Sequence, residues 1–151
     1  MFSGFLPSII TTGADMKQGR IFLWALGLFY LANLLGTLPF ASASLFSQMY
    51  PGFVPDAGTP AFRLLSDAWA VVGLQLGAIG IVALWGTRDP LRYLAVFDIV
   101  IATEVVDALW DFYSITWSHE AMAFGLTTLV IHPVWIVWAL YARRAVVKAA
   151  R

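Results

Sequence analysis

Long apolar runs alternate with short polar connections along the chain. Four of these runs lie at residues 21–39, 65–86, 94–115 and 121–141. Each is close to the roughly 20 residues that a helix needs to cross the hydrocarbon core of a bilayer. The pattern therefore predicts an all-α integral membrane protein, a four-helix bundle formed by a single transmembrane domain at residues 1–151. The connection at residues 40–64 is predicted to be a long loop between the first and second spans.

The composition agrees with a membrane protein. The chain is 60% hydrophobic and 12% charged, with a mean hydropathy of +0.79, whereas soluble domains are usually about 45–50% apolar and about 25% charged. The spans use most of the 151 residues, so no length is left for a separate soluble catalytic domain. The formal net charge is zero, which gives no basic face for a nucleic acid. The absence of cysteine excludes disulfides, thiolate metal sites and a cysteine nucleophile.

The basic residues indicate how the spans are oriented. Eight of the nine lysines and arginines flank the spans on one side: Lys17, Arg20, Arg88, Arg92, Arg143, Arg144, Lys148 and Arg151. Only Arg63 falls on the other side. Because basic residues are enriched on the cytoplasmic side of a membrane, this distribution predicts that both termini are cytoplasmic and that the long loop is external.

Acidic residues interrupt the third span. Glu104, Asp107 and Asp111 are three and four positions apart, and a helix turns by about 100° per residue, so the three carboxylates share one face. Exposing such groups to lipid would cost several kcal/mol, and intramembrane acids commonly mark functional sites. The stripe is therefore expected to face the inside of the bundle or a wet cavity.

Polar side chains of the other spans are predicted to reach the same region. His132 in the fourth span lies near the middle of the membrane, by a count of about 1.5 Å per residue from its outer end. The deeper group is expected to contain Asn33, Gln75, Glu104, Asp107 and His132. The group nearer the outside is expected to contain Arg63, Asp67, Asp111, His119 and Glu120. Together they predict a polar pocket that opens outward.

Several kinds of chemistry suit this pocket. Three clustered carboxylates cannot all remain charged in a poorly solvated site, so some must be protonated, paired with a cation or bound to metal. We expect a small lipophilic ligand and, if the protein is an enzyme, proton transfer such as isomerisation, cyclisation or hydration. Glu104 or Asp107 would then be the catalytic acid or base, with His132 as partner. The predicted ligand-binding residues are Asn33, Asp67, Gln75, Asp111, Trp110 and Trp135.

The acids are also compatible with two alternative roles. Intramembrane Asp, Glu and His side chains can carry protons or cations, although four helices leave little room for a gated path and no inverted repeat is evident. Alternatively, the acids fix the helix register of an accessory subunit. No cofactor is expected. Glu, Asp and His do suit a divalent metal, but the sequence has no Glu-x2-His or His-x3-His pair to hold one.

The second span carries a stripe of small residues. Gly73 and Gly77 are four positions apart, a spacing that permits two helix backbones to approach closely in a membrane. If the protein is an accessory subunit or a homo-oligomer, this stripe is predicted to form the interface with the partner. Gln75 lies about 180° away, on the face expected to line the pocket.

Short motifs occur in the spans and connections: Phe29-Tyr30-Leu31, Met49-Tyr50-Pro51-Gly52 and Arg88-Asp89-Pro90. Together with the acidic third span, they resemble the small BphX-like membrane proteins, over about residues 21–141. The resemblance implies a four-span protein of the bacterial inner membrane, in a family named for genes near aromatic-degradation operons. It implies no particular activity. The DoxX-like four-helix proteins are a more distant alternative.

Overall fold

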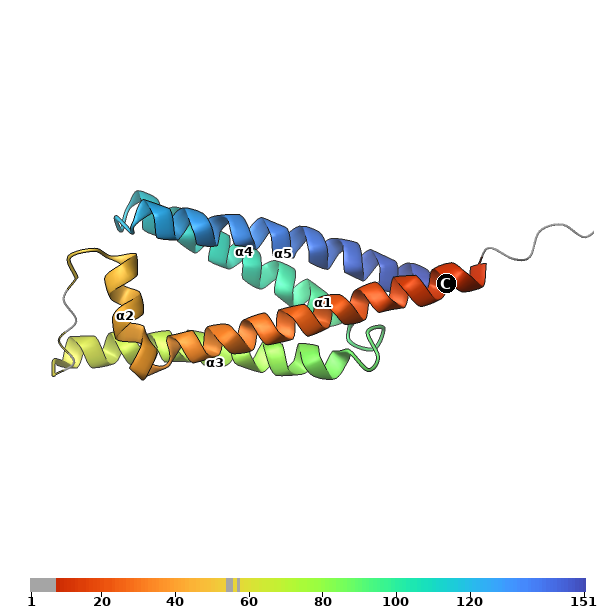
Figure 1. The fold of residues 1–151 in the computed structure, drawn as a ribbon, viewed down its shortest axis with the longest axis horizontal. Coiled ribbons are helices and arrows are strands. Elements are labelled where there is room, and N and C mark those ends of the chain that lie inside the picture. Colours follow the sequence, from red (N-terminus) through yellow and green to blue (C-terminus); the bar gives the residue numbers. More distant parts are fainter. Residues whose placement is uncertain (1–7, 54–55, 57) are drawn as a thin grey trace, which may run out of the picture.

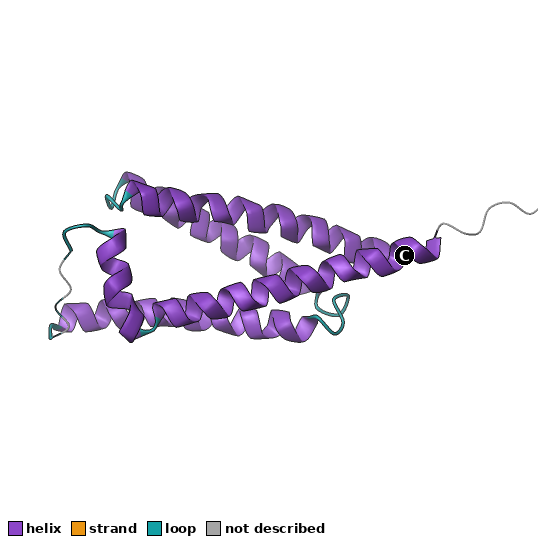
Figure 2. Cartoon of the chain, viewed as in Figure 1, coloured by secondary structure: helices purple, strands orange, loops and turns teal. Residues whose placement is uncertain are grey.

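The computed structural model describes residues 8–53, 56 and 58–151, and this part of the chain is all-α, without strands. Five helices follow one another: α1 (Ser8–Thr37), α2 (Pro39–Met49), α3 (Pro60–Gly86), α4 (Leu94–Thr116) and α5 (Met122–Ala149). Figure 1 shows the four long helices running along the length of the molecule. Figure 2 shows the short α2 crossing them at the end away from the C-terminus.

Helix α2 corrects the prediction of a long loop at residues 40–64. Pro39 and Pro60 stand in the first turns of α2 and α3, where the missing N–H of proline does no harm. Leu38 is extended, with φ −65° and ψ 150°, as a residue before proline prefers to be. Thr59 caps α3 by accepting a hydrogen bond from a first-turn amide. These prolines therefore begin helices, and the connection between α2 and α3 shortens to residues 50–59.

Three helical stretches are long and apolar enough to cross a membrane: Gly13–Thr37 in α1, Pro60–Gly86 and Met122–Ala149. Helix α4 has the length, but four carboxylates lie within its 23 residues, so composition alone does not mark it as a span. The count therefore differs from the four spans predicted. Large apolar side chains are exposed along all four long helices, among them Leu28, Leu74, Leu109 and Val137. This is the outer surface expected of a helical membrane protein.

The long helices form two pairs. α1 packs along α3 and α4 packs along α5, and α1 also contacts α5, whereas α3 and α4 make few contacts. Figure 1 shows the pairs close together near the C-terminus and spread apart towards α2. The narrow end is filled by a buried apolar core that includes Phe22, Leu26, Phe97, Val100 and Ala139. At the wide end, other side chains and open space lie between the two helix pairs.

Glycines hold α1 and α3 together. A Cβ atom at Gly80 would lie 3.0 Å from the carbonyl oxygen of Gly27, so the two backbones are in direct contact. Gly73 packs in the same way against Thr37 of α1, and Gly77 also packs on α1. The stripe predicted to form a partner interface is therefore covered within the same chain. A partner that used it would have to displace α1.

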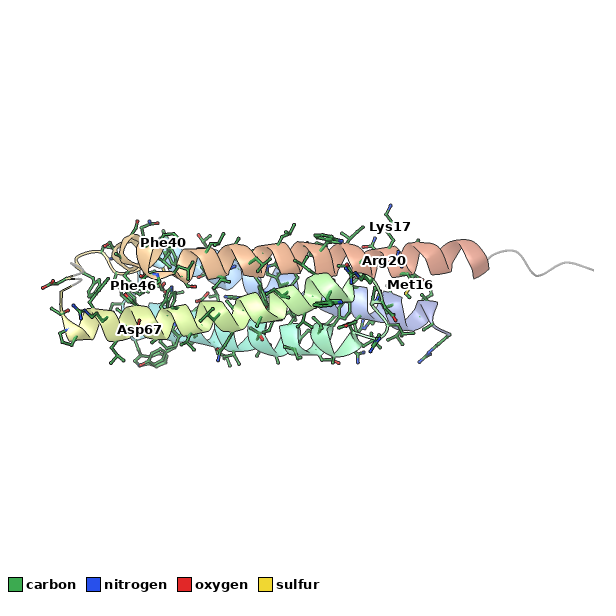
Figure 3. The ribbon with its side chains drawn as sticks, turned by 90° about the horizontal axis from the view of Figure 1, so that it is seen from below. Met16, Lys17, Arg20, Phe40, Phe46 and Asp67 are labelled. Carbon is green, nitrogen blue, oxygen red and sulfur yellow. The ribbon has the colours of Figure 1, made fainter. Side chains whose placement is uncertain are left out.

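The two ends of the bundle differ in charge. Figure 3 shows Lys17 and Arg20 near the beginning of α1 and Asp67 at the opposite end, beside α2. The C-terminus lies at the same end as the beginning of α1 (Figure 1). The described part of the chain therefore enters and leaves the bundle at its basic end.

Candidate functional site

A cavity of about 630 Å³ lies between the helix pairs, at their wide end. Small-molecule sites usually have about 300–1,000 Å³. All five helices contribute to its wall, which is mostly apolar and includes the aromatic side chains of Phe29, Trp69, Trp110 and Phe124. Polar side chains also line it, chief among them Tyr30, Asn33, Glu104, Asp107, Asp111 and His132. The cavity is thus an apolar chamber with one group of ionisable residues.

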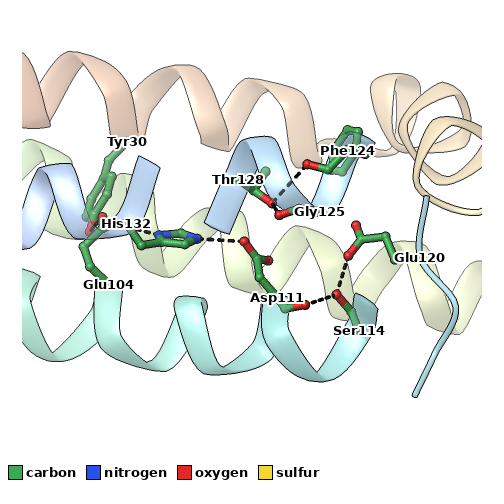
Figure 4. A network of polar contacts seen from close by, with 9 residues as sticks. All are labelled: Tyr30, Glu104, Asp111, Ser114, Glu120, Phe124, Gly125, Thr128 and His132. Carbon is green, nitrogen blue, oxygen red and sulfur yellow. Dashed lines mark hydrogen bonds and ion pairs between the residues drawn. The ribbon is translucent and has the colours of Figure 1, made fainter. Parts of the chain in front are cut away.

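His132 lies between two carboxylates of α4. Its Nδ1 is 2.7 Å from Glu104 Oε2, and its Nε2 is 3.1 Å from Asp111 Oδ2. The other oxygen of Glu104, Oε1, accepts a hydrogen bond of 2.6 Å from the Tyr30 hydroxyl. Figure 4 shows these four side chains joined in one line across α1, α4 and α5. We call Tyr30, Glu104, His132 and Asp111 the histidine cluster.

Helix geometry explains how the cluster forms. Glu104 and Asp111 are seven positions apart, close to two turns of α4, so their side chains stand on one face and reach both nitrogens of a single imidazole. Glu104 is only 1% exposed. A carboxylate buried to this extent needs partners for its oxygens, and Tyr30 and His132 supply one each. The acidic spacing noted in the sequence therefore produces the convergence that it predicted.

The contacts of His132 set a minimum of two protons for the cluster. Each contact with a carboxylate needs one proton, because a bare imidazole nitrogen and a bare carboxylate oxygen repel each other. With a proton on each ring nitrogen, His132 carries one positive charge and the two carboxylates carry one negative charge each, so the three groups together carry one negative charge. Moving either proton onto its carboxylate leaves this sum unchanged. Within the described residues, the ion pairs of Glu104 and Asp111 are with His132 alone. With these two protons alone, the cluster carries one negative charge.

Asp107 lines the same cavity, one helical turn from both acids of the cluster. It makes no side-chain hydrogen bond or ion pair within the described part of the chain. Asn33 enters the cavity wall from α1, and its side-chain nitrogen donates to the carbonyl of Phe29 at 2.9 Å. The side-chain oxygen of Asn33 is left as an acceptor. Trp110 also lines the cavity.

A second set of contacts lies at the end of the cavity next to α2. Ser114 donates to the carboxylate of Glu120, whose own amide donates to the carbonyl of Ser114 at 3.1 Å. The next amide, of Ala121, donates to the carbonyl of Met49 at 2.7 Å. Burial raises the pKa of Glu120 and the charge of Asp111 adds to the rise, against the Ser114 hydrogen bond, which lowers it. This connection ties the end of α2 to the α4–α5 pair.

Three residues predicted for the site lie elsewhere. Gln75 and Asp67 are exposed on α3 and are not part of the cavity wall. The glycine face of α3 packs on α1, so the opposite face, which carries Gln75, points outward and not into the bundle. Trp135 packs in the aromatic part of the core, with ring centroids 5.0 Å from Phe29 and 5.4 Å from Trp138. It supports the cavity wall through Phe29.

Two members of the predicted outer group, Arg63 and His119, are likewise exposed and outside the cavity wall. Conversely, Tyr30 and Trp69 belong to the wall without having been predicted there. For Tyr30 a signal existed, since its hydroxyl interrupts an apolar span at about the depth of Glu104. For Trp69 none did, because an aromatic residue near the end of a span is typical of a membrane interface.

The nitrogens of His132 and the facing oxygens of Glu104 and Asp111 are occupied by contacts with each other. The described residues contain no group of three or more His, Asp or Glu side chains placed to hold a metal. His132 directs both ring nitrogens at carboxylates, so neither nitrogen has a lone pair directed at an ion. The cluster is therefore a hydrogen-bonded acid–base assembly.

Comparisons with known proteins identify the family. The BphX-like family model matches residues 16–148. Two BphX-like proteins, from Burkholderia cepacia and Paraburkholderia xenovorans strain LB400, are each 68% identical over 130 residues, which is 86% of this chain and 94% of the relative. Neither relative's name states an activity. No solved structure matches the chain. The resemblance of the sequence motifs is confirmed, and the chain belongs to the BphX-like family.

Proposed function

We propose that the protein is a four-span bundle of the bacterial inner membrane, with both termini in the cytoplasm. Helix α4 is about 35 Å long and packs along α5, which is sufficient for a fourth crossing. Three of its acids face the cavity or the histidine cluster and so avoid lipid. The basic end of the bundle suits the cytoplasmic side, and both relatives are bacterial.

Within this bundle, the wide end binds a small lipophilic ligand. The single observation that carries this proposal is the apolar-walled cavity of about 630 Å³ that meets the histidine cluster. Such a combination of apolar wall and few converging polar groups is typical of ligand sites. In a membrane, the cavity is open to molecules that partition into lipid or arrive from the outer surface.

The cluster equips the site for acid–base chemistry. Asp107 is the carboxylate free to meet a ligand, whereas both oxygens of Glu104 are already bonded. In an isomerisation or cyclisation, Asp107 would accept a proton from one ligand atom and return it to another, so no co-reactant is required. As the charge on Asp107 changes, the proton between His132 and Glu104 would shift from one group towards the other. We therefore place Asp107 as the acid or base and His132 with Glu104 as its supporting pair.

Packing argues against the two alternative functions. A path for protons or cations would have to continue through the narrow end, where Phe22, Leu26 and Phe97 are fully buried in an apolar core. An accessory subunit that docks through the glycine stripe would need a face that α1 already covers. Ligand binding uses the space that the fold leaves open.

A matched pair of alanine substitutions tests ligand binding. Ala68 lines the cavity, whereas Ala78 is exposed on the same helix and outside the cavity wall. Binding of 4-phenylbutanol to protein in phosphatidylcholine nanodiscs would be measured by equilibrium dialysis, against empty nanodiscs. We expect saturable binding to the wild type and to Ala78→Phe, and a loss of about tenfold or more in Ala68→Phe, because the new ring fills the cavity. Equal binding by the two variants would contradict the proposal.

A further inference from the structure

We propose that the ligand is a lipophilic amine, bound as its ammonium ion, with the charged head against Asp107 and the histidine cluster. This inference rests on the proposed ligand-binding function and adds the chemical class of the ligand. It follows from three properties of the cavity: its uncompensated negative charge, the acceptors left free in its wall and its aromatic side chains.

The charge is the first property. With only the two protons that His132 requires, the histidine cluster carries one negative charge, and Asp107 adds an acid with no partner in the described residues. Among the described residues, no lysine or arginine lines the cavity. Arg143 pairs with Asp98, at 2.8 Å, and Lys148 pairs with Asp15, at 3.5 Å, near the basic end of the bundle. A cation supplied by the ligand would balance this charge, and in a poorly solvated site the attraction is several times stronger than in water.

The free hydrogen-bonding groups beside the cluster are the second property. The Asp107 carboxylate is unpaired within the described chain, and the side-chain oxygen of Asn33 is free, while one of the two Asn33 N–H groups donates to Phe29. The free oxygens of both residues are acceptors. An ammonium group brings three donors and no acceptor, and therefore matches these oxygens, whereas a carboxylate head would be repelled by Asp107.

The aromatic wall is the third property. Phe29, Trp69, Trp110 and Phe124 surround the space next to the acids. Aromatic faces attract organic cations as well as apolar groups, with tryptophan the strongest. The cavity can therefore hold both parts of an amphiphilic amine, with the ammonium group at the acids and the apolar body along the rings.

A pair of probes of equal length tests the proposal. 4-Phenylbutylamine is a cation at pH 7, and 4-phenylbutanol is its neutral counterpart. Binding of each to protein in phosphatidylcholine nanodiscs would be measured by equilibrium dialysis, with empty nanodiscs as the blank. We expect the amine to bind the wild type at least about tenfold more tightly than the alcohol. In Asp107→Asn, the preference for the amine over the alcohol should fall to about threefold or less.

Asp98→Asn is the matched control, because Asp98 is an exposed acid of the same helix that pairs with Arg143 away from the cavity. It should keep the full preference for the amine. Thermal unfolding of each variant would show that the fold is retained. If both probes bind equally well, or if Asp107→Asn keeps the preference, the ammonium site is overturned while ligand binding stands. If neither probe binds to the wild type, both proposals fail.

Discussion

His132 Nδ1 and Glu104 Oε2 lie 2.7 Å apart, although the two residues are 28 positions apart in the chain and belong to different helices. The contact joins α4 to α5, and the Tyr30 hydroxyl on the other oxygen of Glu104 adds α1. A single buried carboxylate therefore connects three of the four long helices. It also forms part of the wall of the cavity, so the stability of the bundle and the chemistry of the site depend on the same group.

Replacing Tyr30 with phenylalanine should destabilise the fold. The substitution removes the donor to Glu104 Oε1, an oxygen buried in a residue that is 1% exposed. A lost hydrogen bond to a charged group costs about 1.5–3 kcal/mol, and this loss would be measured as the change in free energy of unfolding. Tyr113→Phe is the control, because Tyr113 is 48% exposed on α4. Its effect should stay below about 0.5 kcal/mol. Equal effects of the two substitutions would contradict the assigned role of Tyr30.

Glu104 and Asp107 should respond differently to loss of charge. Glu104→Gln removes the charge and keeps only one acceptor oxygen, so either His132 or Tyr30 meets an NH2 donor instead of an acceptor. It should lower the free energy of unfolding by about 3 kcal/mol. Asp107→Asn should change it by less than about 1 kcal/mol, since Asp107 has no partner within the described chain. Denaturation of the purified variants would measure both. A larger loss of stability in Asp107→Asn than in Glu104→Gln would reverse the roles given to the two acids.

A leucine at Gly80 should separate α1 from α3. The Cβ atom alone would lie 3.0 Å from the Gly27 carbonyl oxygen and 3.1 Å from the Tyr30 Cβ, so a whole side chain cannot fit. We expect a loss of at least about 1–3 kcal/mol, or failure to fold. Gly13→Leu adds the same side chain where nothing lies within 4 Å, and should be tolerated. The two variants would be compared by their yield of monodisperse protein and by thermal unfolding. A Gly80→Leu variant as stable as the wild type would refute the close packing of α1 on α3.

The titration of Glu120 should make stability fall as the pH rises. Its pKa in the fold is raised above the ordinary value of 4.5, chiefly by burial, so the folded state favours the protonated acid. The stabilising contribution is complete below about pH 4.5 and is lost as the pH rises through the folded pKa. Glu120→Gln lacks this titration. The variant should therefore equal the wild type in acid and become the more stable protein towards pH 7.

Thermal unfolding of the wild type and Glu120→Gln between about pH 4 and pH 7 would measure this difference in stability. Because all other acids are the same in the two proteins, the difference reports on Glu120 alone. Hydrogen exchange at the Ala121 amide gives a local reading, because that amide joins the connection to Met49 in α2. A difference in stability that shrinks as the pH rises would contradict the raised pKa.

The sequence predicted that the acids of α4 share one face and meet His132, because helical spacing decides which side chains share a face and lipid excludes acids from the outer face. It grouped His132 with Glu104 and Asp107, whereas the contacts of His132 are with Glu104 and Asp111. It failed at Gln75. Spacing placed this residue opposite the glycine stripe, but which face of a helix meets its neighbours depends on packing across the bundle. Here the glycines admit α1, so Gln75 points outward.

The short helix α2 was missed for a different reason. Prolines end helices when they lie inside them, but Pro39 and Pro60 stand in the first turn of α2 and α3, where they are tolerated. The cavity was also beyond prediction in any detail. Its volume results from the divergence of the two helix pairs, which depends on the core around Phe22 and Phe97 at the other end.

The most direct test of the outward-opening cavity uses the absence of cysteine in the chain. Ala32 lines the cavity, so Ala32→Cys should react with a membrane-impermeant methanethiosulfonate reagent added from the outer side of intact cells. 4-Phenylbutylamine should slow this reaction. Ala78→Cys, exposed on α3 outside the cavity wall, should remain unmodified in lipid. Failure of Ala32→Cys to react from outside, or reaction at the rate of Ala78→Cys, would contradict the proposed site.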